Sequence, residues 1–521
     1  MVDLTNMLPK AEIIWSPQQQ AFLDWCRNGS GSCILVAVAG AGKTTVLIAG
    51  GEVIEGQVAY MAYNRDVVDE TKAKLDKRGI SWKKMQANTA HGFGFGAYRK
   101  ARPDVRLDDN KVRNLINKQM GLGNPLAVYA GEIKRLVSLA KQHMIGGPGG
   151  HVNDMHTWLE LADHHDVFDP DEGETIPEQE IIQFAQEVLR QSTAMLDLID
   201  FDDMIYMPLV HKVRFWRFAN IFVDEAQDTN AARRALVRAM LMPGGRVVAV
   251  GDPAQAIYGF TGADADSLDL IARDFNCVRL PLTVSYRCPQ EVVKFAQQWV
   301  NHIQAAPQAP VGSVKAIAYD ELFSRNDLGG NAAILCRNNK PLVSLAFALI
   351  RRRIPCRIEG KDIAKRIQKL ITRWKVKTLD ALETKLDIYL QRETTKLLAK
   401  KQEAKLAEVE DAVETVRVII DQCRQEKKTR IADAVAFVDT LFGDKVTNML
   451  VLSSIHKAKG REWEQVFWLD RTGTCPSKWA RQAWQQEQER NLMYVAATRA
   501  KADLIELQAA PTTKQLRSPI H

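Results

Sequence analysis

A short glycine-rich segment, AVAGAGKTT at residues 37–45, carries the clearest chemistry in this chain. It follows an apolar run, CILVAVA, and precedes VLIAG, which is compatible with a helix. Small residues let backbone N–H groups wrap around phosphate oxygens, and the following helix adds its positive end. Lys43 would neutralise β- and γ-phosphates, and the Thr44 hydroxyl would hold Mg²⁺. The segment therefore predicts a phosphate-binding P-loop, with these candidate contacts: Ala39, Gly40, Ala41, Gly42, Lys43, Thr44 and Thr45.

A second segment, ANIFVDEAQD at residues 219–228, supplies the carboxylates that such a site requires. Its β-branched and aromatic residues predict a strand that ends in Asp224 and Glu225. Asp224 can hold Mg²⁺ through water, and Glu225 can take the proton from an attacking water. Another apolar strand leads into GDPAQ, where we expect Gln255 to sense the γ-phosphate. These residues are the predicted catalytic partners of the P-loop.

Aromatic side chains follow several predicted strands. They occur in QVAYMAYNRD at 57–66, in MQANTAHGFGFGAY at 85–98, and in IYGF shortly after Gln255. We interpret 85–98 as a strand that ends in a glycine- and aromatic-rich loop. Ligands lie at strand ends in α/β sheets, and rings with glycine clearance can stack on unpaired bases. Core packing is the alternative for each ring. The candidate nucleic-acid contacts are Tyr63, His91, Phe93, Tyr258 and Phe260.

Composition places the chain among ordinary soluble proteins. Its 521 residues predict three or four structural units, with 46% hydrophobic and 26% charged residues. The net charge of +7 is a mild indication of a polyanionic partner. Eight scattered cysteines without a CxxC pair argue against a zinc ribbon or a disulfide framework and favour a reducing, cytoplasmic location. No apolar segment predicts a membrane span or a secretion signal, so we expect no membrane partner.

Two mainly helical segments interrupt the strand–helix pattern. The first, 99–196, contains five of the ten histidines. They lie at positions 143, 151, 156, 164 and 165. Their spacing fits no zinc pattern, so we expect surface histidines on a helical insertion.

The second helical segment, 359–445, contains a heptad seam. Its apolar residues stand three and four apart, at 406, 409, 413, 416, 420 and 423. An intramolecular helical subdomain is favoured over a partner-binding coiled coil. At its start, residues 351–377 hold eleven Lys or Arg against two acidic residues. This basic run is either a phosphate contact or a solvated face.

Taken in order, the motifs resemble those of the UvrD/Rep-like superfamily 1 DNA helicases. The P-loop resembles the family's Walker A motif, in which Ala37 is a common first residue, and VDEAQD resembles Walker B. Gln19 resembles the adenine-reading glutamine. The remaining motifs appear in the family's order as AYNRD, TAHGF, GDPAQAIYGFTGA, SYR, SSIHKAKGREWE and YVAATRAK. The AYN and TAHGF details resemble the F-box-bearing branch most, although no F-box segment is evident.

Three features depart from the family pattern. Thr261 stands where many relatives have Arg, and Ser285 stands where Asn is usual. The segment 359–445 is also shorter than the corresponding insertion of the larger bacterial relatives. In the family that insertion is tied to duplex gripping and autoinhibition, so unwinding strength and regulation stay open.

The resemblance implies an α/β fold with two RecA-like P-loop domains, each with a parallel sheet and a mainly helical insertion. We expect the second sheet to begin near CVRLPLTVSYRCP, residues 277–289. The implied divisions are 1–98 and 197–276 for the first RecA-like domain, 99–196 for its insertion, 277–358 and 446–521 for the second domain, and 359–445 for its reduced insertion.

The resemblance also implies that ATP and Mg²⁺ lie in the cleft between the two domains. Arg287 and Arg499 would reach across as arginine fingers, which stabilise the charge of the transition state. The further nucleotide contacts that it implies are Gln19 and Tyr286 at the adenine, and Gly460 and Glu462 at phosphate and ribose. The further nucleic-acid contacts are Asn64, Arg337 and His456.

The implied function is that of an ATP-hydrolysing DNA helicase that moves 3′-to-5′ on single-stranded DNA and acts at single/double-strand junctions, in DNA repair or replication. Polarity is inferred by analogy alone. Two alternatives remain open. One is a translocase that strips bound proteins from single strands with little unwinding. The other is an ATP-gated subunit that regulates a partner, such as a nuclease or a replication or repair factor.

Overall fold

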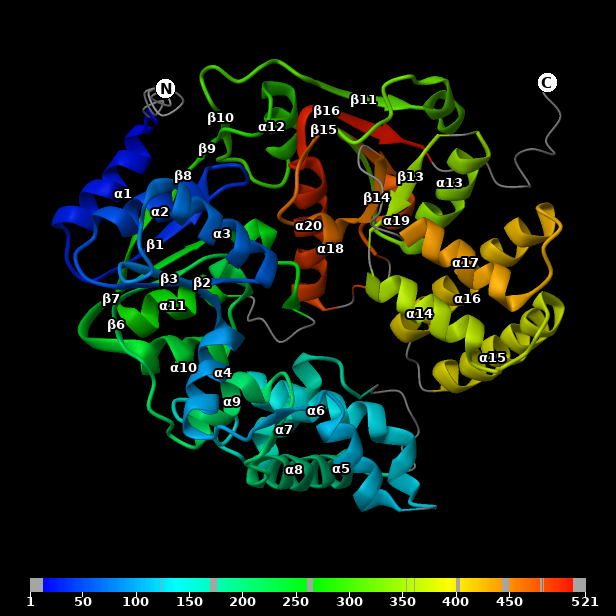
Figure 1. The fold of residues 1–521 in the computed structure, drawn as a ribbon, viewed down its shortest axis with the longest axis horizontal. Helices are drawn as coiled ribbons and strands as arrows, with labels where there is room; N and C mark the ends of the chain where they lie inside the picture. The colour runs from blue at the N-terminus through cyan, green and yellow to red at the C-terminus, as the bar shows by residue number, and fades with distance from the viewer. Residues whose placement is uncertain are drawn as a thin grey trace, which may run out of the picture.

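The computed structural model describes most of the chain between residues 13 and 508. The described ranges are 13–121, 123–168, 176–259, 266–352, 354–359, 361–399, 403–442, 449–477, 480 and 482–508. The predicted contact Phe260 and the family departure at Thr261 lie outside them. Two six-stranded sheets organise the described chain, and all their described strand pairs are parallel. This confirms the predicted α/β class. In Figure 1 the sheets lie on either side of α20 (Ala483–Ala497).

The first sheet has the strand order β3-β2-β6-β7-β1-β8. Its strands are β1 (Ser32–Ala37), β2 (Val58–Ala62), β3 (Met85–Thr89), β6 (Phe218–Val223), β7 (Leu241–Gly251) and β8 (Cys277–Leu282). The accompanying helices are α1 (Pro17–Asn28), α2 (Lys43–Val53), α3 (Arg65–Arg78), α4 (Ala90–Ala101), α9 (Asp203–Val210), α10 (Ala231–Met240) and α11 (Ser267–Phe275). We call this sheet and its helices the first lobe. Because the strands are parallel, the residues that follow β1, β2, β3, β6 and β7 gather at one edge.

Strand β8 corrects the predicted division between the two sheets. The sequence predicts that the second sheet begins near residues 277–289. Instead, β8 pairs with β1 along its whole length and forms an edge of the first sheet. Apolar patterning marks residues 277–282 as a strand, but it does not specify which strand pairs with them. The first lobe therefore extends to at least Leu282.

The glycine- and aromatic-rich segment after β3 is helix α4, so the predicted loop is wrong. Thr89 caps the start of the helix, because its Oγ1 accepts a hydrogen bond from the Gly92 N–H at 2.9 Å. A Cβ on Gly94 would lie 2.2 Å from the Met204 carbonyl oxygen of α9. The glycine therefore allows two helices to pack closely, and this packing offsets its low helix propensity.

Four helices fill the segment where the first insertion is predicted. They are α5 (Lys111–Met120), α6 (Ala130–Gln142), α7 (Met155–His164) and α8 (Glu178–Ala194). Strands β4 (Arg106–Leu107) and β5 (Leu198–Ile199) pair where the segment leaves and re-enters the first lobe. Buried Lys111 and Lys141 form ion pairs with Asp203 of α9, at 2.7 and 2.8 Å. These pairs anchor the helices to the lobe.

The histidines of this segment are not all at the surface, contrary to the prediction. His165 is 2% exposed, and its Nε2 lies 3.0 Å from Nε2 of His143. Burial, with the nearby His143, His164 and Arg135, lowers the pKa of His165 to about 3, so the ring is neutral. Among the described residues, no group of three or more His, Cys, Asp or Glu is arranged to hold a metal ion.

The second sheet has the strand order β11-β16-β15-β12-β14-β13. Its strands are β11 (Ser313–Ile317), β12 (Ala332–Cys336), β13 (Cys356–Ile358), β14 (Leu450–Ser454), β15 (Trp463–Leu469) and β16 (Ala500–Leu507). The helices beside it are α12 (Gln290–Ala296), α13 (Asn339–Arg351), α18 (Ile455–Ala458), α19 (Arg471–Thr474) and α20. We call this unit the second lobe. Strands β9 (Val284–Ser285) and β10 (Gln304–Ala305) form a small pair between the lobes in sequence.

Four helices lie between β13 and β14, where the reduced insertion is predicted. They are α14 (Lys361–Thr372), α15 (Leu379–Ala399), α16 (Glu403–Gln425) and α17 (Ile431–Phe442). The heptad seam lies on α16, and its members Val413, Val416 and Ile420 share one core with Leu382 and Leu386 of α15. The seam is therefore satisfied within the chain, which confirms the preference for an intramolecular helical subdomain (Figure 1). Phosphate contact by the basic run 351–377 stays a prediction.

No helix in the described part of the chain has the length and apolar character needed to cross a membrane. All eight cysteines lie among the described residues, and none of them forms a disulfide.

Candidate nucleotide and nucleic-acid site

The P-loop connects β1 to α2, as predicted. Gly40 and Gly42 both adopt φ of 74°, a left-handed conformation that glycine tolerates best. Gly40 also admits the close approach of the segment after β8. A Cβ there would lie 2.6 Å from both Ser285 Oγ and Arg287 Cβ. The Tyr286 N–H donates to the Gly40 carbonyl oxygen at 2.8 Å. The loop thus leaves the unpaired N–H groups of the α2 N-terminus for a phosphate and brings Tyr286 and Arg287 beside it.

Gln19 lies against the P-loop, where the sequence predicts an adenine contact. Ser16 caps helix α1 in a capping box that includes Gln19. The buried Gln19 amide donates from Nε2 to the Ala41 carbonyl oxygen at 3.2 Å. Tyr286 is 43% exposed and is free to cover a base. The pair lies at the loop, while their contact with adenine stays a prediction.

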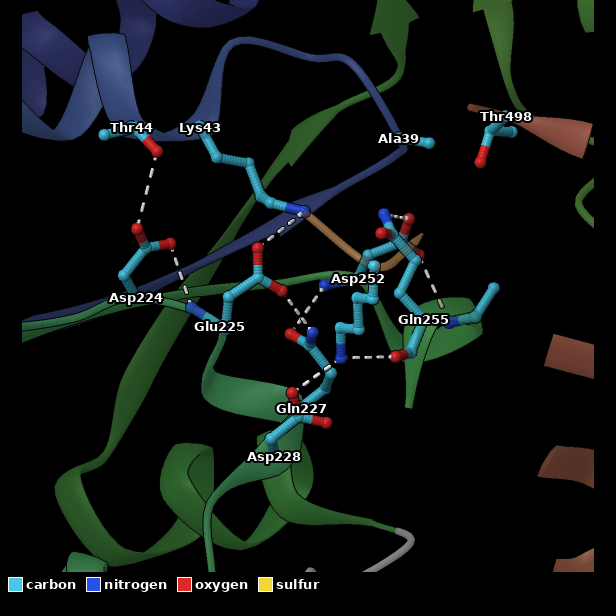
Figure 2. Close-up of polar contacts among 12 residues, drawn as sticks. Ala39, Lys43, Thr44, Asp224, Glu225, Gln227, Asp228, Asp252, Gln255 and Thr498 are labelled. Carbon is cyan, nitrogen blue, oxygen red and sulfur yellow. Dashed lines mark hydrogen bonds and ion pairs between the residues drawn. The ribbon is translucent and has the colours of Figure 1, made fainter. Parts of the chain in front are cut away.

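The two predicted carboxylates meet the P-loop side chains at the end of β6 (Figure 2). Lys43 Nζ lies 3.6 Å from Glu225 Oε1, and the Thr44 hydroxyl donates to Asp224 Oδ2 at 3.5 Å. The Tyr60 hydroxyl of β2 donates to the same Asp224 oxygen at 2.6 Å. The sequence prediction missed Tyr60, which it treated as an ordinary strand residue. Glu225 has φ of 50°, a strained conformation that turns its carboxylate toward Lys43.

The neighbouring charges separate the pKa values of the two buried carboxyl groups. Burial and the neighbouring Glu225 charge raise the pKa of Asp224 to about 6. Burial acts in the same direction on Glu225, but the charges of Lys43 and Lys459 outweigh it and lower that pKa to about 2. The charge of Lys43 also acts on Asp224, but it does not outweigh burial and the Glu225 charge. Two oxygen donors, on Thr44 and Asp224, within hydrogen-bond distance suit Mg²⁺, which takes few protein ligands and completes its shell with phosphate and water.

Arg499 and Tyr494 are among the residues of the second lobe that make polar contacts with the first lobe across the cleft. Arg499 is completely buried, and its Nη2 donates to Gln255 Oε1 at 3.3 Å. Gln255 in turn donates from Nε2 to Asp252 Oδ2 at 2.7 Å. Tyr494 of α20 accepts the Ala39 N–H on its hydroxyl at 3.0 Å. Burial, together with the charge of Arg287, lowers the pKa of Arg499 to about 10, so the group still carries its charge at neutral pH.

Lys459 makes a buried ion pair across the cleft, and the sequence prediction did not single it out. Its Nζ lies 2.6 Å from Asp228 Oδ2 and donates to the Gln255 carbonyl oxygen at 2.7 Å. The side chains of Lys459 and Asp228 are 6% and 1% exposed. Lys459 belongs to the motif SSIHKAKGREWE, and that motif was the available signal. Its reach into the other lobe depends on the tertiary structure.

Arg287 also faces the second lobe. Its Nε donates to Glu462 Oε2 at 2.5 Å, and its Nη1 donates to the Thr498 carbonyl oxygen at 3.4 Å. Glu462 is therefore paired with the predicted finger, and its contact with ribose stays a prediction. Gly460 has φ of 84°, and among the described residues only its chain neighbours could lie within 4 Å of a Cβ placed on it. The space beside this glycine is compatible with an approaching phosphate.

Two of the predicted base-contacting rings stack on each other at the cleft. The rings of Tyr63 and Tyr258 lie 5.4 Å apart at 15°. Lys459 Nζ lies 4.9 Å from the Tyr258 ring centroid, and Arg233 lies 5.5 Å from that of Tyr63. The Tyr258 hydroxyl donates to the His456 carbonyl oxygen at 2.9 Å. Lys459 therefore contacts both the aromatic pair and, through its hydrogen bond to the carbonyl oxygen, Gln255.

The other predicted nucleic-acid residues are engaged within the protein. The His91 ring stacks on Phe201 at 4.0 Å, and burial with the Arg233 charge lowers its pKa to about 3. Arg337 Nη2 forms an ion pair with Glu489 of α20 at 2.8 Å. Asn64 caps α3 by accepting the Val67 N–H, and Phe93 meets the Phe218 ring edge-on at 6.0 Å. Each of these residues therefore has a structural role within the protein. Its contact with nucleic acid stays a prediction.

Two protein-family models match the chain, one in each lobe. The family model described as UvrD/REP helicase N-terminal domain matches residues 15–276, and the model described as UvrD-like helicase C-terminal domain matches residues 361–507. The chain is similar to DNA helicase II of Haemophilus influenzae, with 24% identity over 378 residues, 63% of this chain and 49% of that protein.

Two further relatives show the same pattern. ATP-dependent DNA helicase Rep of Buchnera aphidicola is 24% identical over 294 residues, 52% of this chain and 43% of that protein. ATP-dependent DNA helicase UvrD1 of Mycobacterium tuberculosis is 29% identical over 202 residues, 31% of this chain and 26% of that protein. The matches span about half or less of the length of these relatives. With the P-loop, the paired carboxylates and two family models in sequence order, the chain belongs to the UvrD/Rep-like superfamily 1 helicases.

Proposed function

We propose that this chain is an ATP-hydrolysing motor that moves 3′-to-5′ on single-stranded DNA and unwinds duplex at junctions. The observation that carries the proposal is the double contact across the cleft. Arg499 and Lys459 of the second lobe bind Gln255 and Asp228 of the first lobe, beside Lys43 and Glu225. Hydrolysis then requires the lobes to be closed, and each turnover releases them.

Each side chain has a role in this scheme that its surroundings support. Lys43 neutralises the phosphates, and Glu225 stays ionised at neutral pH, so it can orient water and accept its proton. Gln255 couples the γ-phosphate to Arg499 through the hydrogen bond between them. Thr44 and Asp224 would hold Mg²⁺, which neutralises charge on the phosphate oxygens when it is bound. Arg287 is the second proposed finger.

The aromatic pair links turnover to strand movement. Lys459 touches both the Gln255 carbonyl and the Tyr258 ring, so opening of the cleft moves the stacked rings relative to the second lobe. Bases that stack on Tyr63 and Tyr258 would be gripped and released in step with hydrolysis. A Gln255→Ala variant should hydrolyse ATP without productive movement. Normal coupling in this variant would contradict the scheme.

The decisive experiment measures ATP turnover with and without single-stranded DNA, and then unwinding of 3′-tailed and 5′-tailed duplexes. We expect DNA-stimulated turnover and unwinding of the 3′-tailed substrate, with Lys43→Ala as the inactive control. Equal turnover with and without DNA would reject the motor. Displacement of streptavidin without unwinding would favour the protein-stripping translocase. An ATP-gated regulatory subunit would instead activate a partner nuclease even as Lys43→Ala, provided that ATP still binds.

We also propose that the two lobes are the two RecA-like domains, with the helical groups α5–α8 and α14–α17 as their insertions. The first of these domains then includes β8. A cytoplasmic location and a role in repair or replication are part of the same proposal.

A further inference from the structure

A groove of about 1410 Å³ lies on the first lobe, outside the nucleotide site. Its walls come from α4, from the C-terminal end of α10, and from the irregular segment 212–217 between α9 and β6. Phe218 and Met242, near the starts of β6 and β7, also line it. Asp224 follows the other end of β6, six residues beyond Phe218, which is about 20 Å away at the rise of a strand. The groove is therefore separate from the phosphate site.

The groove carries a concentrated positive charge. Its lining cations are Lys100, Lys212, Arg214, Arg217 and Arg238, all of them exposed. No Asp or Glu is among the described residues that line it. Arg238 pairs with Asp274 at 3.3 Å, whereas no carboxylate of the described chain lies within ion-pair distance of the other four cations. Five positive charges in one groove, four of them without an ion pair among the described residues, favour an anionic ligand.

An exposed indole stands among these charges. Trp216 is 63% exposed, and it lies between Arg214 and Arg217 in the segment KVRFWR. Its neighbour Phe215 packs against the core of the lobe and holds the segment in place. An aromatic face beside phosphate-binding cations is the combination that proteins use to bind single strands. An acidic peptide would use the charges, but it would leave the indole without a stacking partner.

The groove also continues from residues that the sequence predicts to contact nucleic acid. It runs along α4 from Gly92 and Phe93, at the strand-end edge of the sheet, to Lys100 and Ala101 at the far end of the helix. That length is about 13 Å at the rise of an α-helix. A strand that passes the end of β3 would enter the groove at Phe93 and meet the segment 212–217 further along.

We infer that this groove is a second binding site for single-stranded nucleic acid, which holds the strand by phosphate contacts and by stacking of a base on Trp216. The site anchors the strand outside the motor cleft, because none of the described residues that line the groove contacts the second lobe. The inference rests on the proposed function in one respect only, namely that the same nucleic-acid strand also passes through the cleft. Binding to the groove itself needs no ATP.

The test is equilibrium binding, without nucleotide, of a fluorescein-labelled oligothymidylate of about 30 nucleotides over a range of salt concentrations. The groove variant combines Lys212→Gln, Arg214→Gln and Arg217→Gln. Its matched control combines Arg27→Gln, Lys294→Gln and Lys315→Gln, three exposed cations elsewhere on the chain. We expect the groove variant to lower the slope of log affinity against log salt by about 2, since each lost phosphate contact removes about 0.7. The control should keep the wild-type slope.

Single substitutions at Trp216 test the stacking. Trp216→Ala should weaken binding by roughly fivefold or more, the low end of what one stacked base contributes, and Trp216→Phe should restore most of it. Thermal melting of every variant, compared with wild type, establishes that the fold is retained. An unchanged slope in the folded groove variant would overturn the inference. So would loss of polyglutamate binding with intact oligonucleotide binding, because that result would assign the groove to an acidic peptide.

The two proposals fail in different ways. If wild-type ATP turnover ignores DNA while the groove variant loses affinity, the motor fails and the groove stands. If DNA stimulates turnover but the groove variant binds like wild type, the motor stands and the groove inference is wrong.

Discussion

The ion pair between Lys459 and Asp228 should decide how readily the two lobes close. Both side chains are almost completely buried, and they meet only across the cleft, at 2.6 Å. Removing one partner of a buried pair costs about 3–5 kcal/mol because the other charge is left unpaired. The cost falls on the closed arrangement, since Asp228 can be solvated when the lobes part. Neither lobe depends on the pair for its own core.

A Lys459→Met variant tests how much the ion pair contributes to closure of the lobes. At 1.36 kcal/mol for each factor of ten, the closed population falls by at least about a hundredfold. We expect DNA-stimulated ATP turnover to fall by the same factor, while nucleotide binding to the first lobe is retained. The double variant Lys459→Met/Asp228→Asn should recover part of the loss, because it removes the orphaned charge as well. Fluorescence energy transfer between dyes on the two lobes reports closure directly.

The pH dependence provides a further check with a definite sign. Burial raises the pKa of Asp228, and the positive charge of Lys459 opposes this rise. Without Lys459 the pKa rises further, so the closed form of the variant takes up a proton that the open form releases. Closure of Lys459→Met should therefore recover as pH falls from about 8 to about 6, and Asp228→Asn should abolish that recovery.

The matched control is Lys501→Met, which removes a surface ion pair with Glu464 at 2.8 Å. Exposed pairs contribute about 0–1 kcal/mol, so turnover should change by less than about fivefold. Turnover of Lys459→Met within about threefold of wild type, with normal closure, would refute the reasoning. It would mean that the cleft contact does not limit the motor.

Three other predictions concern the finger, the metal site and the packing of α4. Arg499→Gln should bind ATP but lose roughly a thousandfold or more in turnover, measured by steady-state kinetics beside nucleotide titration. Asp224→Asn should abolish turnover yet raise the melting temperature in magnesium-free buffer, because an ionised Asp224 with a raised pKa opposes folding. This gain should be largest above about pH 6 and should shrink as pH falls toward the unfolded value; a pH-independent gain would point to another cause. Gly94→Ala should destabilise by about 1–3 kcal/mol in denaturant unfolding, because its Cβ would overlap α9. Gly96→Ala, with open space around it, should instead stabilise by about 0.5–1 kcal/mol, and similar effects of the two would reject the packing argument.

Much of the phosphate site can be predicted from residue order alone. A P-loop needs small residues, a lysine and a hydroxyl in one short loop between strand and helix, and all of these are contiguous at residues 37–45. The same holds for the strand that delivers Asp224 and Glu225, and for the cap of α1 at Ser16. Such signals are local, because hydrogen bonding and side-chain spacing over a few residues determine them.

Tertiary packing, and not the local sequence, determines how distant segments pair. The apolar pattern of residues 277–282 would suit a strand in either sheet, and pairing with β1 together with packing of α11 assigns them to the first. The segment after β3 contains loop-forming glycines, yet contact with α9 makes it a helix. Local propensity is worth about 1 kcal/mol per glycine, which tertiary packing readily outweighs.

What the amino-acid sequence determines by itself is therefore the family, the two-sheet α/β class and the identity of the chemical groups at the P-loop. What only the tertiary structure decides is which groups meet across the cleft. Lys459 and Asp228 are 231 residues apart in sequence, and Arg499 and Gln255 are 244 apart. No local pattern encodes contacts over such separations. They arise because the two lobes pack against each other, through a hydrophobic cluster with residues from both, and bury charged groups from each side.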